Sequence, residues 1–236
     1  MKKLTLPYKQ IVDKYHISMI KFILNNQLIE TTAPTGMALL DFIRKNRQLK
    51  GSKLVCKEGE CGACSVLVGE LKEDGMFYQS MTSCITPLVN AHGKHIVTIE
   101  GLNMEKLSPV QQAMVDCYGT QCGFCTPGFV VSLSGYLLTN KAATLEGIIA
   151  AIDGNICRCT GYKGIERAAE KIVNQVNLDL SKINIPNLVS QKYIPAYFNE
   201  IPTKLSNLKI EKTPTTGNVK LGGGTDLYVQ LSLIHI

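Results

Sequence analysis

A short cysteine-rich stretch, residues 56–64, constrains this chain more than any other feature. Its three cysteines follow the spacing C-x4-C-x2-C, and a fourth, Cys84, comes about twenty residues later. Iron prefers soft thiolate ligands, so several cysteines must converge on one place. Gly59, Gly62 and Ala63 leave room in the loop, and glycine adopts backbone angles that other residues avoid. The spacing is typical of a loop that holds a [2Fe–2S] cluster, with the ligands Cys56, Cys61, Cys64 and Cys84.

Length and composition place the chain in a broad class. Its 236 residues are enough for one large domain or two to three small ones. The start Met1-Lys2-Lys3 lacks the apolar run of a secretory signal, and no segment reaches transmembrane length. We therefore expect a cytoplasmic protein, in which a content of nine cysteines indicates metal binding or catalysis rather than disulfides. The net charge of +6 is dispersed, so we expect neither a nucleic-acid nor a membrane partner.

The first part of the chain alternates strand signals with one helix signal. Residues 1–18 look like a separate N-terminal extension. Asn25-Asn26 offers a two-residue hairpin turn, and Asp74-Gly75 offers a second turn. Thr35 is the expected cap of a helix over 37–45. The pattern predicts a small α+β domain over 19–100, with strands at 19–24, 27–29, 65–68, 76–78 and 96–99.

From Gly101 the signals become helical. Ser108 with Gln111 forms a capping box, and Thr126-Pro127 and Thr144 mark two further helix starts. A fourth helix over 165–176 has one apolar face, and four short helices predict a compact bundle over 101–178. Prolines then punctuate a polar stretch, which predicts a helix-poor linker over 179–215, at Pro186, Pro195, Pro202 and Pro214.

The helical region carries a second cysteine set. Cys122 and Cys125 form a C-x2-C pair, and Cys157 and Cys159 form a C-x-C pair. From spacing alone these four thiols suit either a second iron–sulfur cluster or a zinc site. Cys117, the ninth cysteine, is expected to be a small buried hydrophobic residue. His92 and His95 are expected at the surface, not as metal ligands, because no third partner is in register.

The two cysteine sets together resemble one family. Residues 121–128 (QCGFCTPG) and 155–162 (NICRCTGY) look like the second [2Fe–2S] domain of the molybdenum hydroxylases, which include xanthine dehydrogenase, aldehyde oxidase and carbon monoxide dehydrogenase. The Cys56 loop with Cys84 resembles the first domain of that family, and the resemblance runs from about Met19 to Asn177. It implies a β-grasp ferredoxin domain, a four-helix cluster domain and two [2Fe–2S] clusters with eight cysteine ligands. The second four of these are Cys122, Cys125, Cys157 and Cys159.

The resemblance also implies an order of electron carriers. The second cluster would lie nearest a molybdopterin cofactor that a partner large subunit or domain binds, with Gln121 and Cys159 in contact with it. The first cluster would lie nearer an FAD. Residues 216–236 resemble the start of the family's flavin domain, although a glycine-rich surface turn is the alternative in isolation. Backbone amides of such a loop can approach a pyrophosphate, here at Leu221, Gly222, Gly223, Gly224, Thr225, Asp226 and Leu227.

These implications lead to a functional hypothesis. We expect an oxidoreductase subunit, xanthine dehydrogenase-like and serving purine catabolism, that transfers electrons from molybdopterin through two clusters to FAD and carries no catalytic residue of its own. The order of cluster domains before a flavin loop favours the xanthine dehydrogenase type. The alternatives are the iron–sulfur subunit of an aldehyde oxidase or carbon monoxide dehydrogenase type, a stand-alone ferredoxin-type carrier, and a zinc protein that uses the second cysteine set.

Overall fold

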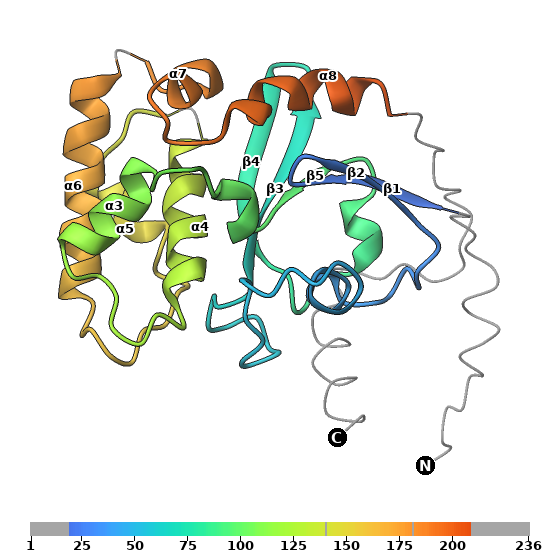
Figure 1. Cartoon of the computed structure of the whole chain (residues 1–236), viewed down its shortest axis with the longest axis horizontal. Helices are drawn as coiled ribbons and strands as arrows, with labels where there is room; N and C mark the ends of the chain where they lie inside the picture. The colour runs from blue at the N-terminus through green and yellow to red at the C-terminus, as the bar shows by residue number, and fades with distance from the viewer. Residues whose placement is uncertain (1–18, 140, 181, 209–236) are drawn as a thin grey trace.

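The computed structural model describes residues 19–139, 141–180 and 182–208. A mixed sheet forms one half of the molecule and a group of helices forms the other (Figure 1). The last helices run along one edge of the molecule and reach both halves (Figure 1). The predicted α+β class is therefore confirmed. The expected extension 1–18 and the expected start of a flavin domain at 216–236, with its glycine loop, lie outside the described residues.

The sheet has five strands in the order β2-β1-β5-β3-β4. The central strand β5 runs parallel to β1 and antiparallel to β3. Asn25 adopts a φ of 55° in the turn between the first two strands, as the predicted hairpin requires. All the predicted strands are found, with the bounds β1 Ile20–Leu24, β2 Gln27–Thr31, β3 Ser65–Lys72, β4 Gly75–Thr82 and β5 His95–Val97.

Both faces of this sheet are buried, because alternate residues of a strand point to opposite sides. On one face Val66 and Val68 pack with Phe22 and Phe42 in a core cluster under the short helices α2 (Leu39–Asp41), η1 (Phe42–Asn46) and η2 (Leu88–Ala91). On the other face Leu67 belongs to the larger core cluster that also contains the helical half. One face of the sheet therefore shares a core cluster with the helical half, and the other face has a core cluster of its own.

The start of the first helix corrects a prediction. Thr35 is not its cap: the helix begins at Leu39 after Ala38, which makes no side-chain capping bond. The amides of Leu39 and Leu40 instead donate to the carbonyls of Thr86 and Ser83, at 2.8 and 3.0 Å. The loop around Cys84 thus satisfies the first amides of the helix, which removes the need for a local cap.

The helical half follows its sequence signals closely. Ser108 forms the expected capping box with Gln111 before α3, and Thr144 accepts from Gly147 before α5. The predicted apolar face of α6 is buried in the core from Ile165 to Val176. The four helices are α3 Pro109–Asp116, α4 Thr126–Leu137, α5 Leu145–Ala150 and α6 Lys163–Asp179, and the short η3 Ile99–Leu102 precedes them.

The segment after α6 is helical, so the prediction of a helix-poor linker is wrong over the described residues 182–208. Its elements are α7 (Ile185–Ser190), η4 (Ala196–Glu200) and α8 (Ile201–Ser206). Pro186 and Pro202 lie in the first turns of α7 and α8, where the missing N–H is not needed. These prolines therefore start helices instead of breaking them.

His95 is the third correction: it is expected at the surface, but its side chain is fully buried. One ring nitrogen bonds the Tyr78 hydroxyl and the other bonds the Asn25 carbonyl, both at 2.8 Å. Phe198 of η4 packs against the same ring, with centroids 5.5 Å apart. Burial lowers the pKa of His95 to about 4. His92 is half-buried and accepts from the Lys21 amide through Nδ1.

None of the helices in the described residues is both long and apolar enough to cross a bilayer.

Candidate metal centres

The first four predicted ligands lie on two loops at one end of the sheet. Cys56 and Cys61 lie on the loop between η1 and β3, Cys64 lies immediately before β3, and Cys84 lies between β4 and η2. Ser83 joins the two loops, because its amide and its hydroxyl donate to the Cys64 carbonyl at 3.4 and 2.6 Å.

The thiols of this set are grouped in two hydrogen-bonded pairs, Cys56 with Cys61 and Cys64 with Cys84. A hydrogen bond from the Cys84 thiol lowers the pKa of Cys64 to about 6, and the same bond raises the pKa of Cys84. Burial acts to raise the pKa of Cys56, but backbone amides led by that of Glu58 lower it overall. Amides that stabilise a thiolate also prepare it to bind iron, because the ligand is the deprotonated sulfur.

Glycines allow this loop to fold and to approach the second cysteine set. Gly59 and Gly62 have φ values of +78° and +67°, which favour glycine. A Cβ on Gly62 would lie 2.4 Å from Nδ2 of Asn155 and 2.6 Å from the Gly154 carbonyl oxygen. The sequence predicts that the glycines leave space for a cluster, and the structure shows that Gly62 also leaves space for the neighbouring protein loop.

The second four predicted ligands lie at helix ends. Cys125 is the N-cap of α4, Cys122 precedes it, and Cys157 and Cys159 lie on the turn between α5 and α6. These thiols also form two pairs: the sulfurs of Cys122 and Cys159 are 3.5 Å apart, and Cys125 is hydrogen-bonded to Cys157. Cys122 and Cys159 are exposed, whereas Cys157 is buried.

The electrostatics repeat those of the first set, because one thiol of each pair has a lowered pKa. The Phe124 amide and then the Cys159 thiol lower the pKa of Cys122, and the hydrogen bond to Cys122 raises that of Cys159. Burial acts to raise the pKa of Cys157, but hydrogen bonds led by the Thr160 hydroxyl lower it to about 7. Burial and then Cys157 raise the pKa of Cys125 to about 12.

This donor set suits a binuclear cluster. Each set of four thiols divides into two pairs, and each iron of a [2Fe–2S] cluster takes two thiolates. No group of three or more His, Cys, Asp and Glu side chains converges on a single ion position within the parts of the chain that the structure describes. The pairing of the thiols fits a [2Fe–2S] cluster, and the assignment of the eight cysteines as its ligands stays a prediction.

The two cysteine sets are in direct contact through their backbones. The Ile156 amide donates to the Cys61 carbonyl at 3.0 Å, and the Asn155 side chain donates to the Gly62 carbonyl at 3.1 Å. Gly128 in the first turn of α4 completes the contact, since a Cβ there would lie 2.4 Å from the Gly62 carbonyl oxygen. Asn155 is buried. The loops that carry the two sets are therefore held against each other.

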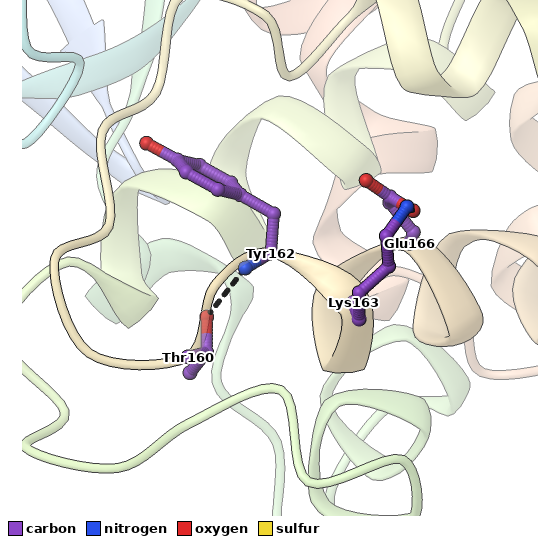
Figure 2. A network of polar contacts seen from close by, with 4 residues as sticks. All are labelled: Thr160, Tyr162, Lys163 and Glu166. Carbon is purple, nitrogen blue, oxygen red and sulfur yellow. Dashed lines mark hydrogen bonds and ion pairs between the residues drawn. The ribbon is translucent and has the colours of Figure 1, made fainter.

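The remaining predicted residues have simpler positions. Gln121 is exposed next to Cys122, and Cys117 is half-buried against the larger core. Sequence reasoning gave no role to Asn155, Thr160 or Tyr162, although all three belong to the NICRCTGY string. Figure 2 shows Thr160 and Tyr162 joined by a hydrogen bond at the start of α6. A polar residue beside a ligand cysteine was the signal that could have marked them.

Family models identify both cysteine regions. The model described as "2Fe-2S iron-sulfur cluster binding domain" matches residues 22–89, and the model described as "[2Fe-2S] binding domain" matches residues 98–170. The second match answers the zinc alternative, since it assigns a [2Fe–2S] cluster to the helical half. Two [2Fe–2S] clusters are thus supported on this chain.

Curated relatives carry the names of two enzymes. A xanthine dehydrogenase of Blastobotrys adeninivorans is 47% identical over 145 residues, which are 60% of this chain and 10% of that protein. A xanthine dehydrogenase/oxidase of Mus musculus is 38% identical over 62% of this chain and 11% of its own length. Aldehyde oxidase 4 of Rattus norvegicus is 37% identical with the same coverage. The chain thus spans about a tenth of the length of these relatives.

Solved structures extend the match to the fold. Quinoline 2-oxidoreductase from Pseudomonas putida 86 aligns with a TM-score of 0.57 at 31% identity, over 68% of this chain and 96% of that chain. Aldehyde oxidoreductase from Desulfovibrio gigas aligns with a TM-score of 0.60 at 34% identity, over 69% of this chain and 18% of that one. The chain therefore belongs to the xanthine dehydrogenase and aldehyde oxidase family of molybdenum hydroxylases, as its iron–sulfur electron-transfer region.

Proposed function

We propose that this chain is the electron-transfer subunit of a xanthine dehydrogenase-like molybdenum hydroxylase, between a molybdopterin centre on a partner subunit or domain and an FAD. When bound, the two [2Fe–2S] clusters supply one-electron carriers. The proposed ligands are the paired thiols of the two sets, Cys56, Cys61, Cys64 and Cys84 for the first and Cys122, Cys125, Cys157 and Cys159 for the second.

One observation carries this proposal: the two cysteine loops touch through a hydrogen bond between backbones. The Cys61 carbonyl accepts from the Ile156 amide at 3.0 Å, and the residue after Ile156 is Cys157. A proposed ligand of one cluster is thereby linked to a proposed ligand of the other by a single hydrogen bond and a short run of covalent bonds. The buried Asn155 holds the contact in place, as a relay with a fixed spacing between its carriers requires.

The exposed side of the second set supports a partner on that side. Cys122 and Cys159 are exposed, and so are Phe124 and Ile156, two large apolar side chains next to proposed ligands. Apolar residues at a rim of this kind are typical of a contact surface. We place the molybdopterin-binding partner here, in contact with Gln121 and Cys159. FAD would bind further along the chain, at Leu221–Leu227, and mark the flavin end of the relay.

The aldehyde oxidase type is a second candidate, because aldehyde oxidase 4 matches the chain at 37% identity, next to 38% for the mouse xanthine dehydrogenase/oxidase. The same relay serves both, since neither proposal places a substrate pocket on this chain. Co-expression with a molybdopterin-binding partner, followed by turnover of purine against aldehyde substrates, separates the two types. A chain that binds no such partner would be a stand-alone ferredoxin-type carrier.

The primary experiment measures metal content and EPR spectra of the anaerobically purified full chain. We expect about four irons and four sulfides per chain, in proportion to two clusters. Two distinct reduced [2Fe–2S] signals should appear on titration with dithionite. One signal together with stoichiometric zinc would contradict the proposal.

A further inference from the structure

The turn that follows Cys157 contains a set of polar contacts that ends on the Cys157 sulfur. The hydroxyl oxygen of Thr160 lies 3.2 Å from that sulfur, and the Thr160 amide donates to it at 3.5 Å. Figure 2 shows Thr160 and Tyr162 together just before α6, with Lys163 and Glu166 paired in the first turn of that helix. The relay described above uses neither Thr160 nor Tyr162.

The neighbours of Thr160 fix the direction of its hydrogen bond. The Tyr162 amide donates to the Thr160 hydroxyl oxygen at 3.2 Å (Figure 2). An iron-bound thiolate accepts hydrogen bonds and has no hydrogen to donate. The hydroxyl oxygen therefore accepts from Tyr162 while the hydroxyl hydrogen is donated to the sulfur of Cys157.

Tyr162 is held in an unusual conformation that makes this arrangement possible. Its φ of 65° and ψ of −23° are left-handed, which is costly for a residue with a side chain. Two contacts compensate: its hydroxyl accepts from the Cys157 amide at 3.0 Å, and its ring packs edge-on against the buried Phe129, with centroids 6.4 Å apart. Tyr162 thus contacts the backbone of Cys157 through its hydroxyl, and it contacts Thr160, which donates to the Cys157 sulfur, through its amide.

The first cysteine set has a hydroxyl in the corresponding place, but it acts differently. Ser83 lies next to Cys84 and contacts Cys64. Its hydroxyl donates its hydrogen to the Cys64 carbonyl, at the short distance of 2.6 Å. The hydroxyl-to-sulfur bond of Thr160 is therefore a feature of the second set.

We propose that Thr160 is a positioning residue that raises the reduction potential of the second cluster by donating its hydroxyl hydrogen to the Cys157 sulfur, and that Tyr162 holds Thr160 in place. Hydrogen bonds to cluster sulfurs stabilise the additional negative charge of the reduced state. The proposal rests on the second cluster of the relay proposed above. The hydrogen bond from Thr160 would make the second cluster easier to reduce than its four thiolates alone would.

Redox titration of the full chain, followed by the EPR signals of both clusters, tests the proposal. Thr160→Val removes the hydroxyl and keeps the branched shape and the amide. At a fixed solution potential, we expect the reduced-to-oxidised ratio of the second cluster to fall about tenfold, which is about 59 mV for one electron. The first cluster should be unchanged. Thr160→Ser should restore the original ratio.

Two further variants make the test decisive. Thr139→Val removes a hydroxyl that donates to the Tyr136 carbonyl, and it should change neither cluster. Tyr162→Phe keeps Thr160 but removes the acceptor of the Cys157 amide, so the ratio should fall in the same direction by less. If Thr160→Val does not assemble the second cluster, Thr160→Ala, which also removes the hydroxyl, decides. An unchanged second cluster in an assembled variant that lacks the Thr160 hydroxyl, or equal shifts of both clusters, would overturn the proposal. A missing second signal in the unmodified chain would instead contradict the relay.

Discussion

The two cysteine sets each bring four proposed cluster ligands together, but they do so with different secondary structure. The first lies on loops at the end of a sheet, where Cys64 is buried and Cys84 is tied to the first helix through its neighbours Ser83 and Thr86. The second lies on helix ends, with Cys157 buried and with Cys122 and Cys159 exposed. The second set contacts the loop of the first set through the backbone amide of Ile156 and the buried side chain of Asn155. We propose that the partner binds on the exposed side, which would give the proposed relay a direction.

Removal of one proposed ligand at a time is the strongest test that the two sets bind separate clusters. Cys61→Ser should abolish or alter the EPR signal of the first cluster alone, because its thiolate pairs with Cys56. Cys125→Ser should do the same for the second cluster alone. EPR spectra of the dithionite-reduced variants measure both effects. If either change erased both signals while the chain stayed folded, the assignment of ligands to separate clusters would be wrong.

The helices after α6 should stabilise both halves of the molecule. Phe198→Ala removes a fully buried ring that packs on Tyr78 and His95, and it should lower the free energy of unfolding by about 3–5 kcal/mol. Phe77→Ala is the matched control, since Phe77 is 42% exposed on the sheet edge and should cost far less. Urea unfolding midpoints compare them. Equal midpoints would mean that this segment is not part of the core.

The contact between the two cysteine loops depends on a missing side chain. Gly62→Ala should destabilise the chain more than Gly161→Ala, although both residues have left-handed backbones with φ values of +67° and +61°. The backbone cost of roughly 1–2 kcal/mol is common to both. The new Cβ at position 62 would in addition meet Asn155 and Gly154, whereas nothing lies within 4 Å at position 161. Thermal unfolding of the two variants gives the difference, and equal losses would place the loops further apart than described.

Acid should weaken the sheet through His95. Burial lowers the pKa of His95 from 6.5 to about 4, so between these values the unfolded chain binds more protons than the folded chain. Stability therefore falls as the pH falls through this window, by about 3 kcal/mol in all. His95→Gln should remove this part of the pH dependence. Urea unfolding of both proteins at pH 7 and pH 4.5 measures it, and parallel losses would exclude His95 as the cause.

Local signals in the sequence predict much of this fold. The hairpin at Asn25, the capping box at Ser108 and the apolar face of α6 depend on neighbours within a few residues, and each is found in the structure. The cysteine spacing likewise predicts that each set of four will converge, because a cluster needs its ligands on short loops. These features require no knowledge of distant parts of the chain.

The errors come from contacts between distant segments. Thr35 is not a cap because Thr86 and Ser83 satisfy the first amides of the helix. His95 is buried because Phe198, about a hundred residues later, covers it. Pro202 begins a helix whose residues Ile201 and Leu205 enter the core. The residues next to them in the sequence give no indication of these long-range contacts. The contact of Asn155 with Gly62 is likewise not predictable from neighbouring residues.

The magnetic interaction between the two clusters tests the central claim most directly, namely that the two cysteine loops are held in contact. The experiment is low-temperature EPR of the full chain, first with one cluster reduced and then with both. The contact through Cys61 and Ile156 predicts that each signal splits or broadens when the other cluster becomes reduced. Two signals that simply add, with no mutual change at full reduction, would contradict the account.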